Sequence, residues 1–118
     1  MYIKLKYLDC EGNNLTSLNN LPPNLEALNC NDNQITSLDN LSLNLKRLYC
    51  GANQLTSLNN LPSNLENIDC SYNQLSLLNN LPSSLENLYC DGNPLIYDFK
   101  PTLKNIRKYN AAHHVPPP

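Results

Sequence analysis

The sequence has no long apolar run and no glycine at position 2. No stretch of it approaches the length that a membrane-spanning helix needs. Met1–Cys10 alternates lysine with apolar residues and lacks the apolar run of a secretory signal. Tyr2 excludes N-myristoylation, which requires glycine at that position. We therefore expect an intracellular protein that acts in the cytoplasm.

Charge is also scarce, and it is unevenly distributed. Charged residues make up 15% of the chain, and the net charge is −2. Residues 1–98 hold four basic and ten acidic residues, whereas residues 99–118 hold four basic residues and no acid. Because phosphate binding needs a basic footprint, we expect no nucleic-acid partner, and the absence of a long apolar run argues against a membrane partner. We interpret the basic C-terminal segment as a solvated face.

What the sequence does contain is a repeat of 20 residues. Aligning the five cysteines gives five rows that share the pattern LxxLxCxxNxLxxLxNLPxx. The rows begin at Leu5, Leu25, Leu45, Leu65 and Leu85. In LxxLxC the fourth and sixth residues share one face at period two, which predicts a short strand. In the third row, Leu48 and Cys50 then point inward, and Arg47, Tyr49 and Gly51 point outward.

A single row cannot enclose its own apolar side chains. Ordering the backbone of one row costs more free energy than burying so few side chains returns. Stacking of successive rows in a parallel ladder must therefore supply the remaining stability. The return segment, such as Thr56–Ser63, is short and rich in serine, asparagine and proline. It predicts an extended or polyproline-like outer face and no helix.

This pattern resembles the leucine-rich repeat family, whose signature is LxxLxLxxN/CxL, over residues 5–95. The LP near the row's end, in which Ser42 replaces the proline in the second row, is similar to the short repeats of secreted bacterial effectors. The cysteine at the sixth position, with NQLTSL after it, is similar to repeat proteins of mimivirus-type giant DNA viruses. The resemblance implies an α/β-type solenoid with a parallel β ladder on a concave, protein-binding face. A viral origin would place the protein in the host cytoplasm.

The two ends of the repeat differ. Pro101 can open a helix, and Leu103 and Ile106 follow at helical spacing. We expect the solenoid over residues 1–98, a C-terminal capping helix within 99–111 and a flexible proline-rich tail over 112–118. The helix should leave three basic side chains in solvent, namely Lys104, Arg107 and Lys108. No helix precedes the first strand, so Lys4 and Lys6 either blunt that edge or leave it to pair with another chain.

Two columns inside the rows receive structural roles. An asparagine follows each strand where the chain turns, and we expect its amide to bond turn backbone in its own row and the next one. These residues are Asn13, Asn33, Asn53, Asn73 and Asn93. A further invariant column on the outer side, predicted to serve turns, consists of Asn20, Asn40, Asn60 and Asn80.

The cysteines form a third column that repeats from row to row. Their number is odd, no CxxC pair occurs, and side chains in a parallel ladder have poor geometry for a disulfide or a tetrahedral metal cage. We expect small buried core residues, with no metal and no cofactor. Cys10 lies nearest an open edge and should be the most reactive thiol. The column consists of Cys10, Cys30, Cys50, Cys70 and Cys90.

The outward strand positions vary from row to row, and the resemblance places them on the concave face. Tyrosine and arginine are common interface anchors. We expect a partner-binding surface, with Tyr72 at its rim, made of Tyr7, Asn29, Arg47, Tyr49, Asn67, Asp69, Tyr89 and Asp91. The alternative is a solvated face on which Arg47 pairs with Asp69. A similar charge ladder would join Lys46 to the acidic residues at the equivalent position of the rows before and after it, Glu26 and Glu66.

No nucleophile, base and orienting group occur together, and no HExxH or phosphate-binding loop is present. We therefore assign no catalytic residue. His113 and His114 lie in the proline-rich tail, where we expect solvated side chains without a fixed partner. Two hypotheses follow. The chain is a protein-interaction module that binds an unknown partner on its concave face, or a structural protein that self-assembles by stacking through its N-terminal edge.

Overall fold

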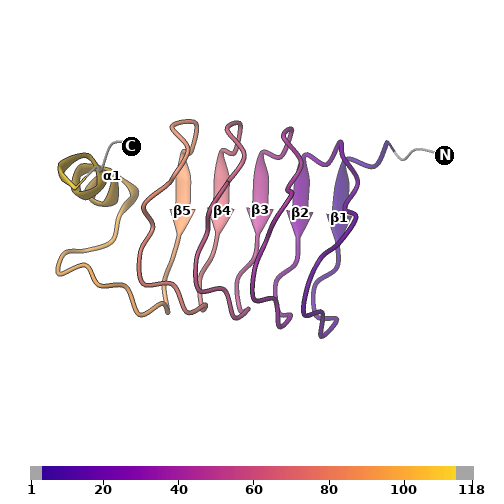
Figure 1. Ribbon diagram of the computed structural model, residues 1–118, viewed down its shortest axis with the longest axis horizontal. Helices are drawn as coiled ribbons and strands as arrows, with labels where there is room; N and C mark the ends of the chain where they lie inside the picture. Colours follow the sequence, from indigo (N-terminus) through magenta and orange to yellow (C-terminus); the bar gives the residue numbers. More distant parts are fainter. Residues whose placement is uncertain (1–3, 114–118) are drawn as a thin grey trace, which may run out of the picture.

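The computed structural model describes residues 4–113. Five strands form one parallel sheet in chain order, each in register with its neighbour, so that Leu28 lies opposite Leu48. Figure 1 shows them side by side, with α1 beyond the last strand. The strands are β1 (Tyr7–Asp9), β2 (Ala27–Asn29), β3 (Arg47–Tyr49), β4 (Asn67–Asp69) and β5 (Asn87–Tyr89).

The chain forms an elongated solenoid of 47 × 27 × 27 Å. The segments that return from one strand to the next contain bends and turns, and no helix occurs within residues 4–102. The predicted solenoid, with its parallel ladder and extended outer face, is therefore confirmed. Among residues 4–113, no helix is long and apolar enough to cross a membrane.

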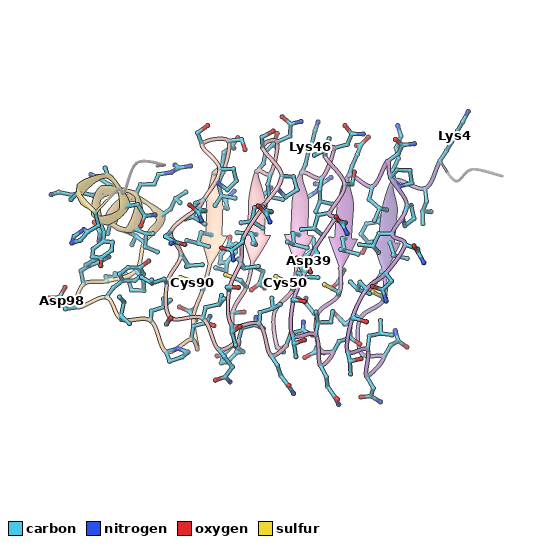
Figure 2. All side chains as sticks on the ribbon, viewed as in Figure 1. Lys4, Asp39, Lys46, Cys50, Cys90 and Asp98 are labelled. Carbon is cyan, nitrogen blue, oxygen red and sulfur yellow. The ribbon has the colours of Figure 1, made fainter. Side chains whose placement is uncertain are left out.

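The interior is built from the same positions in every row. In the third row, Leu45, Leu48, Cys50 and Leu55 are all 0% exposed. Figure 2 shows the sulfur atoms in a line across the rows, between the strands and the return segments. The inward orientation of Leu48 and Cys50 was predicted, but Gly51, expected to point outward, is buried. It lies between Asn31 and Ser71, and its N–H donates to Asn31 Oδ1 at 2.6 Å.

Two turns of the repeat use the left-handed backbone region, the first in all five rows and the second in three. The second residue after each cysteine has a φ between 55° and 73°, as at Gly12, Asp32, Ala52, Tyr72 and Gly92. The second turn uses the outer asparagine column at Asn20, Asn40 and Asn60, with φ between 55° and 59°. Glycine and asparagine tolerate this region best. Asn80 does not adopt a positive φ, so this column serves a left-handed turn in three of its four rows.

Helix α1 (Leu103–Ala112) covers the C-terminal end of the core. Thr102 caps it, because its hydroxyl accepts from the N–H of Asn105 at 3.1 Å. Ile106 is 0% exposed within the core cluster, and Asn110 Nδ2 donates to the carbonyl of Leu78 at 2.9 Å. The predicted C-terminal helix is confirmed. It continues through Ala112, and residues 114–118, with most of the expected tail, lie outside the described part of the chain.

Two predictions about this end are wrong. Arg107 was expected in solvent, but its Nη2 donates to the carbonyls of Pro82, Ser83 and Leu85 at 3.2, 3.3 and 2.8 Å. These carbonyls lie in one turn, so a single guanidinium nitrogen reaches all three, and that of Pro82 also accepts from the N–H of Leu85 at 3.1 Å. His113 was expected without a partner, but its ring stacks on Tyr109 at 3.9 Å between centroids.

Candidate functional site

The asparagine after each strand joins two rows. Asn53 Nδ2 donates to the carbonyls of Cys30 and Cys50 at 3.0 and 3.2 Å, and its Oδ1 accepts from the N–H of Ile35 at 3.0 Å. The same set recurs at Asn33 and Asn73. Each amide therefore bonds its own row and the preceding one, whereas the sequence analysis expected the next row.

The cysteine column is sealed from solvent except at the first row. All five thiols are free; Cys30, Cys50, Cys70 and Cys90 are buried, and Cys10 is partly buried. Burial raises the pKa of Cys30 to about 12 and raises the pKa of Cys50 well above its ordinary value. Burial and the nearby Asp9 carboxylate also raise the pKa of Cys10. Cys10 is the most accessible thiol, but its environment disfavours the reactive thiolate.

The outward column at the end of each strand has a local structural role in three of its rows. Asp9, Asn29 and Asp69 each use Oδ1 to accept from the N–H two residues on, at 3.1, 3.0 and 3.0 Å. Asp69 Oδ1 also accepts from Ser71 Oγ at 2.6 Å. These side chains shape the turn that follows the strand. Asn29 and Asp69 were predicted as partner-binding residues, but one oxygen of each side chain already accepts a hydrogen bond within its own row.

Tyrosine replaces the turn-forming residue in the other two rows. Tyr49 and Tyr89 have no side-chain oxygen at the position that accepts the turn N–H, and Tyr89 is 60% exposed. The side chain of Arg47, two residues before Tyr49 and also exposed, makes no hydrogen bond or ion pair with residues 4–113. These three side chains are held on two strands, β3 and β5, but have no polar partner within the described chain.

The remaining predicted residues of the concave face fall on either side of these three. Asn67 and Asn87 are joined by a hydrogen bond between their side chains. Tyr7 is 52% exposed at the first strand, and its hydroxyl donates to Asp9 Oδ2 at 3.5 Å. Asp91 is exposed in the turn after β5. The structure thus brings Arg47 and Tyr49 together on β3, with Tyr89 two strands away.

A hollow of about 140 Å³ opens beside this surface, where the chain leaves β3 and β4. Gly51 lines it, and a Cβ there would lie 3.2 Å from Ser71 Oγ and 3.4 Å from Asn31 Oδ1. Asp69 and Tyr72 also line it, and Tyr72 is 66% exposed. The sequence analysis missed this hollow, although the glycine that replaces a larger residue at this position was a visible signal.

The predicted surface charge ladders do not form. Within residues 4–113, Lys6 and Glu26 make the one ion pair closer than 4 Å, at 3.7 Å, and both side chains are largely exposed. Arg47 does not pair with Asp69, and Lys46 joins its neighbours through backbone bonds to Glu26 and Glu66. Figure 2 shows Lys46 extending from the rim of the sheet, away from Cys50. The same described residues contain no cluster of three or more metal-ligating side chains.

The repeated strand, the asparagine ladder and the extended return segment together define the architecture. The fold is a leucine-rich repeat solenoid. A family model described as leucine rich repeats, in two copies, matches residues 23–63. Among solved structures, the chain is similar to the leucine-rich repeat domain of a Shigella effector, with 32% sequence identity and a TM-score of 0.62. That match covers 79% of this chain and 52% of the other.

The two findings support the leucine-rich repeat family, and the chain spans about half the length of the solved effector domain that it matches. No curated protein matches the sequence. Neither finding concerns a virus, so the resemblance to giant-virus repeat proteins stays a prediction.

Proposed function

We propose that this leucine-rich repeat chain is a non-enzymatic protein-interaction module that binds a partner protein on the concave face, at Arg47, Tyr49 and Tyr89. The observation that carries the proposal is that the side chains of Arg47 and Tyr89, which are exposed, and of Tyr49, which is half-buried, have no polar partner among residues 4–113. The leucine-rich repeat fold supports an interaction role in general, and the particular surface rests on these side chains.

The chemistry of the surface favours a protein as the partner. Tyrosine offers a large apolar ring with a polar tip, and arginine offers a planar donor group, and both are enriched where interfaces concentrate their binding energy. The strands fix the backbones of these residues, so binding orders side chains alone and costs less conformational entropy than ordering a loop. The hollow lined by Gly51 lies beside this set and suits insertion of one small side chain of the partner.

A pulldown from cytoplasmic extract, followed by binding measurements with the purified partner, tests the proposal. The variant R47A/Y49A/Y89A should lose the partner that the wild type captures. Its melting temperature should change little, because these side chains make no hydrogen bond within the described chain. A matched triple variant on exposed positions of the return side, Q54A/N59A/Q74A, should keep the partner.

The outcome that contradicts the proposal is equally specific. If the concave triple variant retains the same partner at the same affinity, this face is not the binding surface. If the return-side variant loses the partner instead, binding occurs on the opposite face of the solenoid.

The hypothesis of open-ended self-assembly receives less support. Stacking of copies head to tail needs two exposed ends, and α1 covers the C-terminal end of the core through Ile106 and Arg107. The exposed N-terminal edge can then be used by a copy only in a closed arrangement.

A further inference from the structure

Among residues 4–113, β1 has a neighbouring strand on one side only, so the N-terminal edge of the sheet is the open end of the described solenoid. Leu28 and Leu48 are 0% exposed, whereas Leu8, at the same position in the first row, is only partly buried. Leu5 and Tyr7, beside it, are 40% and 52% exposed. A partly exposed core and an exposed strand edge thus lie together at this end.

The outer edge of β1 carries the same polar groups that β2 uses to bind β1. Ala27 N–H donates to the carbonyl of Lys6 at 3.0 Å, and the carbonyl of Asn29 accepts from Cys10 N–H at 2.8 Å. The corresponding groups in the first row are the N–H of Tyr7 and the carbonyl of Asp9. Neither has a partner within residues 4–113. An edge of this kind is a template for another strand.

The side-chain ladder is open at the same place. Asn33 Oδ1 accepts from the N–H groups of Asn13 and Leu15, both at 2.9 Å. Asn13 Oδ1 is the equivalent acceptor of the first row, and no donor among the described residues reaches it. The first row therefore offers hydrogen-bonding groups both along its strand and in the turn that follows.

The structure restricts what can bind there among copies of the chain. A parallel row from the C-terminal end of another copy is blocked, because α1 occupies that end. The free surface that a second copy can present is its own β1 edge, which gives a two-fold, isologous contact. We propose that a second copy of this chain binds the N-terminal edge, with the two β1 strands antiparallel and the two-fold axis at Leu8.

The register follows from the backbone groups of β1. Alternation along the strand directs the N–H and carbonyl of Tyr7 and Asp9 to the open edge, because those of Leu8 face β2. Placing Tyr7 opposite Asp9 of the second copy pairs all of these groups, with four backbone hydrogen bonds across the axis. Leu8 then lies opposite its own copy in the non-hydrogen-bonded pair, where side chains approach most closely.

Charge also favours the antiparallel arrangement. Lys4 and Lys6 lie before β1, and Asp9 and Glu11 lie at its end and just after it. An antiparallel pair places the basic end of one strand beside the acidic end of the other, whereas a parallel pair would place like charges together. The pair between Lys6 and Glu26 does not prevent this, because it is long and exposed.

Analytical ultracentrifugation over a dilution series tests the proposal directly. The wild type should show a reversible equilibrium between monomer and dimer. A monomer at every concentration would overturn the proposal. Growth beyond the dimer would also overturn it, since a two-fold contact closes.

Two substitutions at Asp9 separate the contribution of the edge N–H from that of the carboxylate. Asp9→Pro removes the N–H that points to the open edge, and proline is tolerated on edge strands. Asp9→Ala removes the same carboxylate and keeps the N–H. By symmetry Asp9→Pro loses two hydrogen bonds, so its dimer should dissociate about tenfold more readily than that of Asp9→Ala. Lys108→Glu, exposed on α1, should leave the dimer unchanged. Equal dissociation of the two Asp9 variants would contradict the register.

A cross-linking experiment places the axis. Leu8→Cys should form a covalent dimer under mild oxidation, because the two-fold pair brings the two new thiols together. Leu88→Cys, at the same position of the last row, lies beside α1 and should stay monomeric. Equal cross-linking of both variants, or none by a Leu8→Cys chain that melts cooperatively, would overturn the proposal.

Discussion

The ring of Tyr72 lies directly over Gly92 in the next row. A Cβ added at Gly92 would approach Tyr72 Cδ1 to 2.4 Å, which is closer than real Cβ contacts allow. Both residues have left-handed backbones, with φ of 56° and 73°. The glycine thus serves a turn in its own row and makes space for an aromatic side chain of the row before.

This contact predicts unequal costs for one substitution at two equivalent glycines. Gly12→Ala meets nothing within 4 Å and should cost only the left-handed backbone penalty, about 1–2 kcal/mol. Gly92→Ala also meets Tyr72 and should cost about 1–3 kcal/mol more. Urea unfolding of both variants measures the difference, and adding Tyr72→Ala should remove it. Equal costs for the two glycines would show that the Tyr72 contact is unimportant.

The buried thiols predict a loss of stability in alkaline solution. Burial raises the pKa of Cys30 to about 12 and raises the pKa of Cys50 well above its ordinary value, whereas both thiols ionise near 9.0 once the chain unfolds. The unfolded chain therefore releases protons that the folded chain keeps, so stability is complete below about pH 9 and falls above it. Each such thiol contributes a slope of about 1.4 kcal/mol per pH unit.

Thermal melting from about pH 7 to pH 10 checks this dependence. Cys50→Ala should melt at a lower temperature at neutral pH, because it leaves a small cavity, and should then lose less stability on going to pH 10. If the variant and the wild type lose the same stability over this range, buried thiol ionisation is not the cause.

Arg107 predicts how firmly α1 is held. Arg107→Ala removes three hydrogen bonds to the carbonyls of one turn and should cost about 1.5–3 kcal/mol. Amide hydrogen exchange should then speed up in Leu103–Ala112 before it does in the strands. Lys104→Ala, on the exposed side of the same helix, is the control and should leave exchange unchanged. Equal protection of α1 in all three proteins would mean that Arg107 does not anchor it.

Much of the fold could be predicted because each row repeats the same spacing of apolar residues. The spacing of Leu48 and Cys50 specifies a strand with one buried face, and five copies of that spacing specify the stack. The features that the sequence analysis missed depend on contacts between rows. The hollow at Gly51 and the direction of the asparagine bonds require knowing which neighbour lies on which side.

The candidate site was harder to predict than the core. Asp69 and Asn29 resemble exposed binding residues in the sequence, yet they also complete turns two residues further on. The tyrosines at the same position cannot do this, which separates Tyr49 and Tyr89 from their column. Arg107 was misplaced because helical spacing alone puts it beside the exposed lysines. The carbonyls that bind it are more than 20 residues away in the sequence.

Each row is stable only because neighbouring rows complete it, and the hydrogen bonds of the asparagine ladder are the most direct expression of that dependence. The decisive measurement compares the melting and unfolding free energies of Asn53→Ala and Asn59→Ala. Asn53 is buried and bonds the backbone of two rows, so its loss should cost about 3 kcal/mol or more. Asn59 is exposed, and its loss should cost less than about 0.5 kcal/mol. Equal shifts for the two variants would contradict the account.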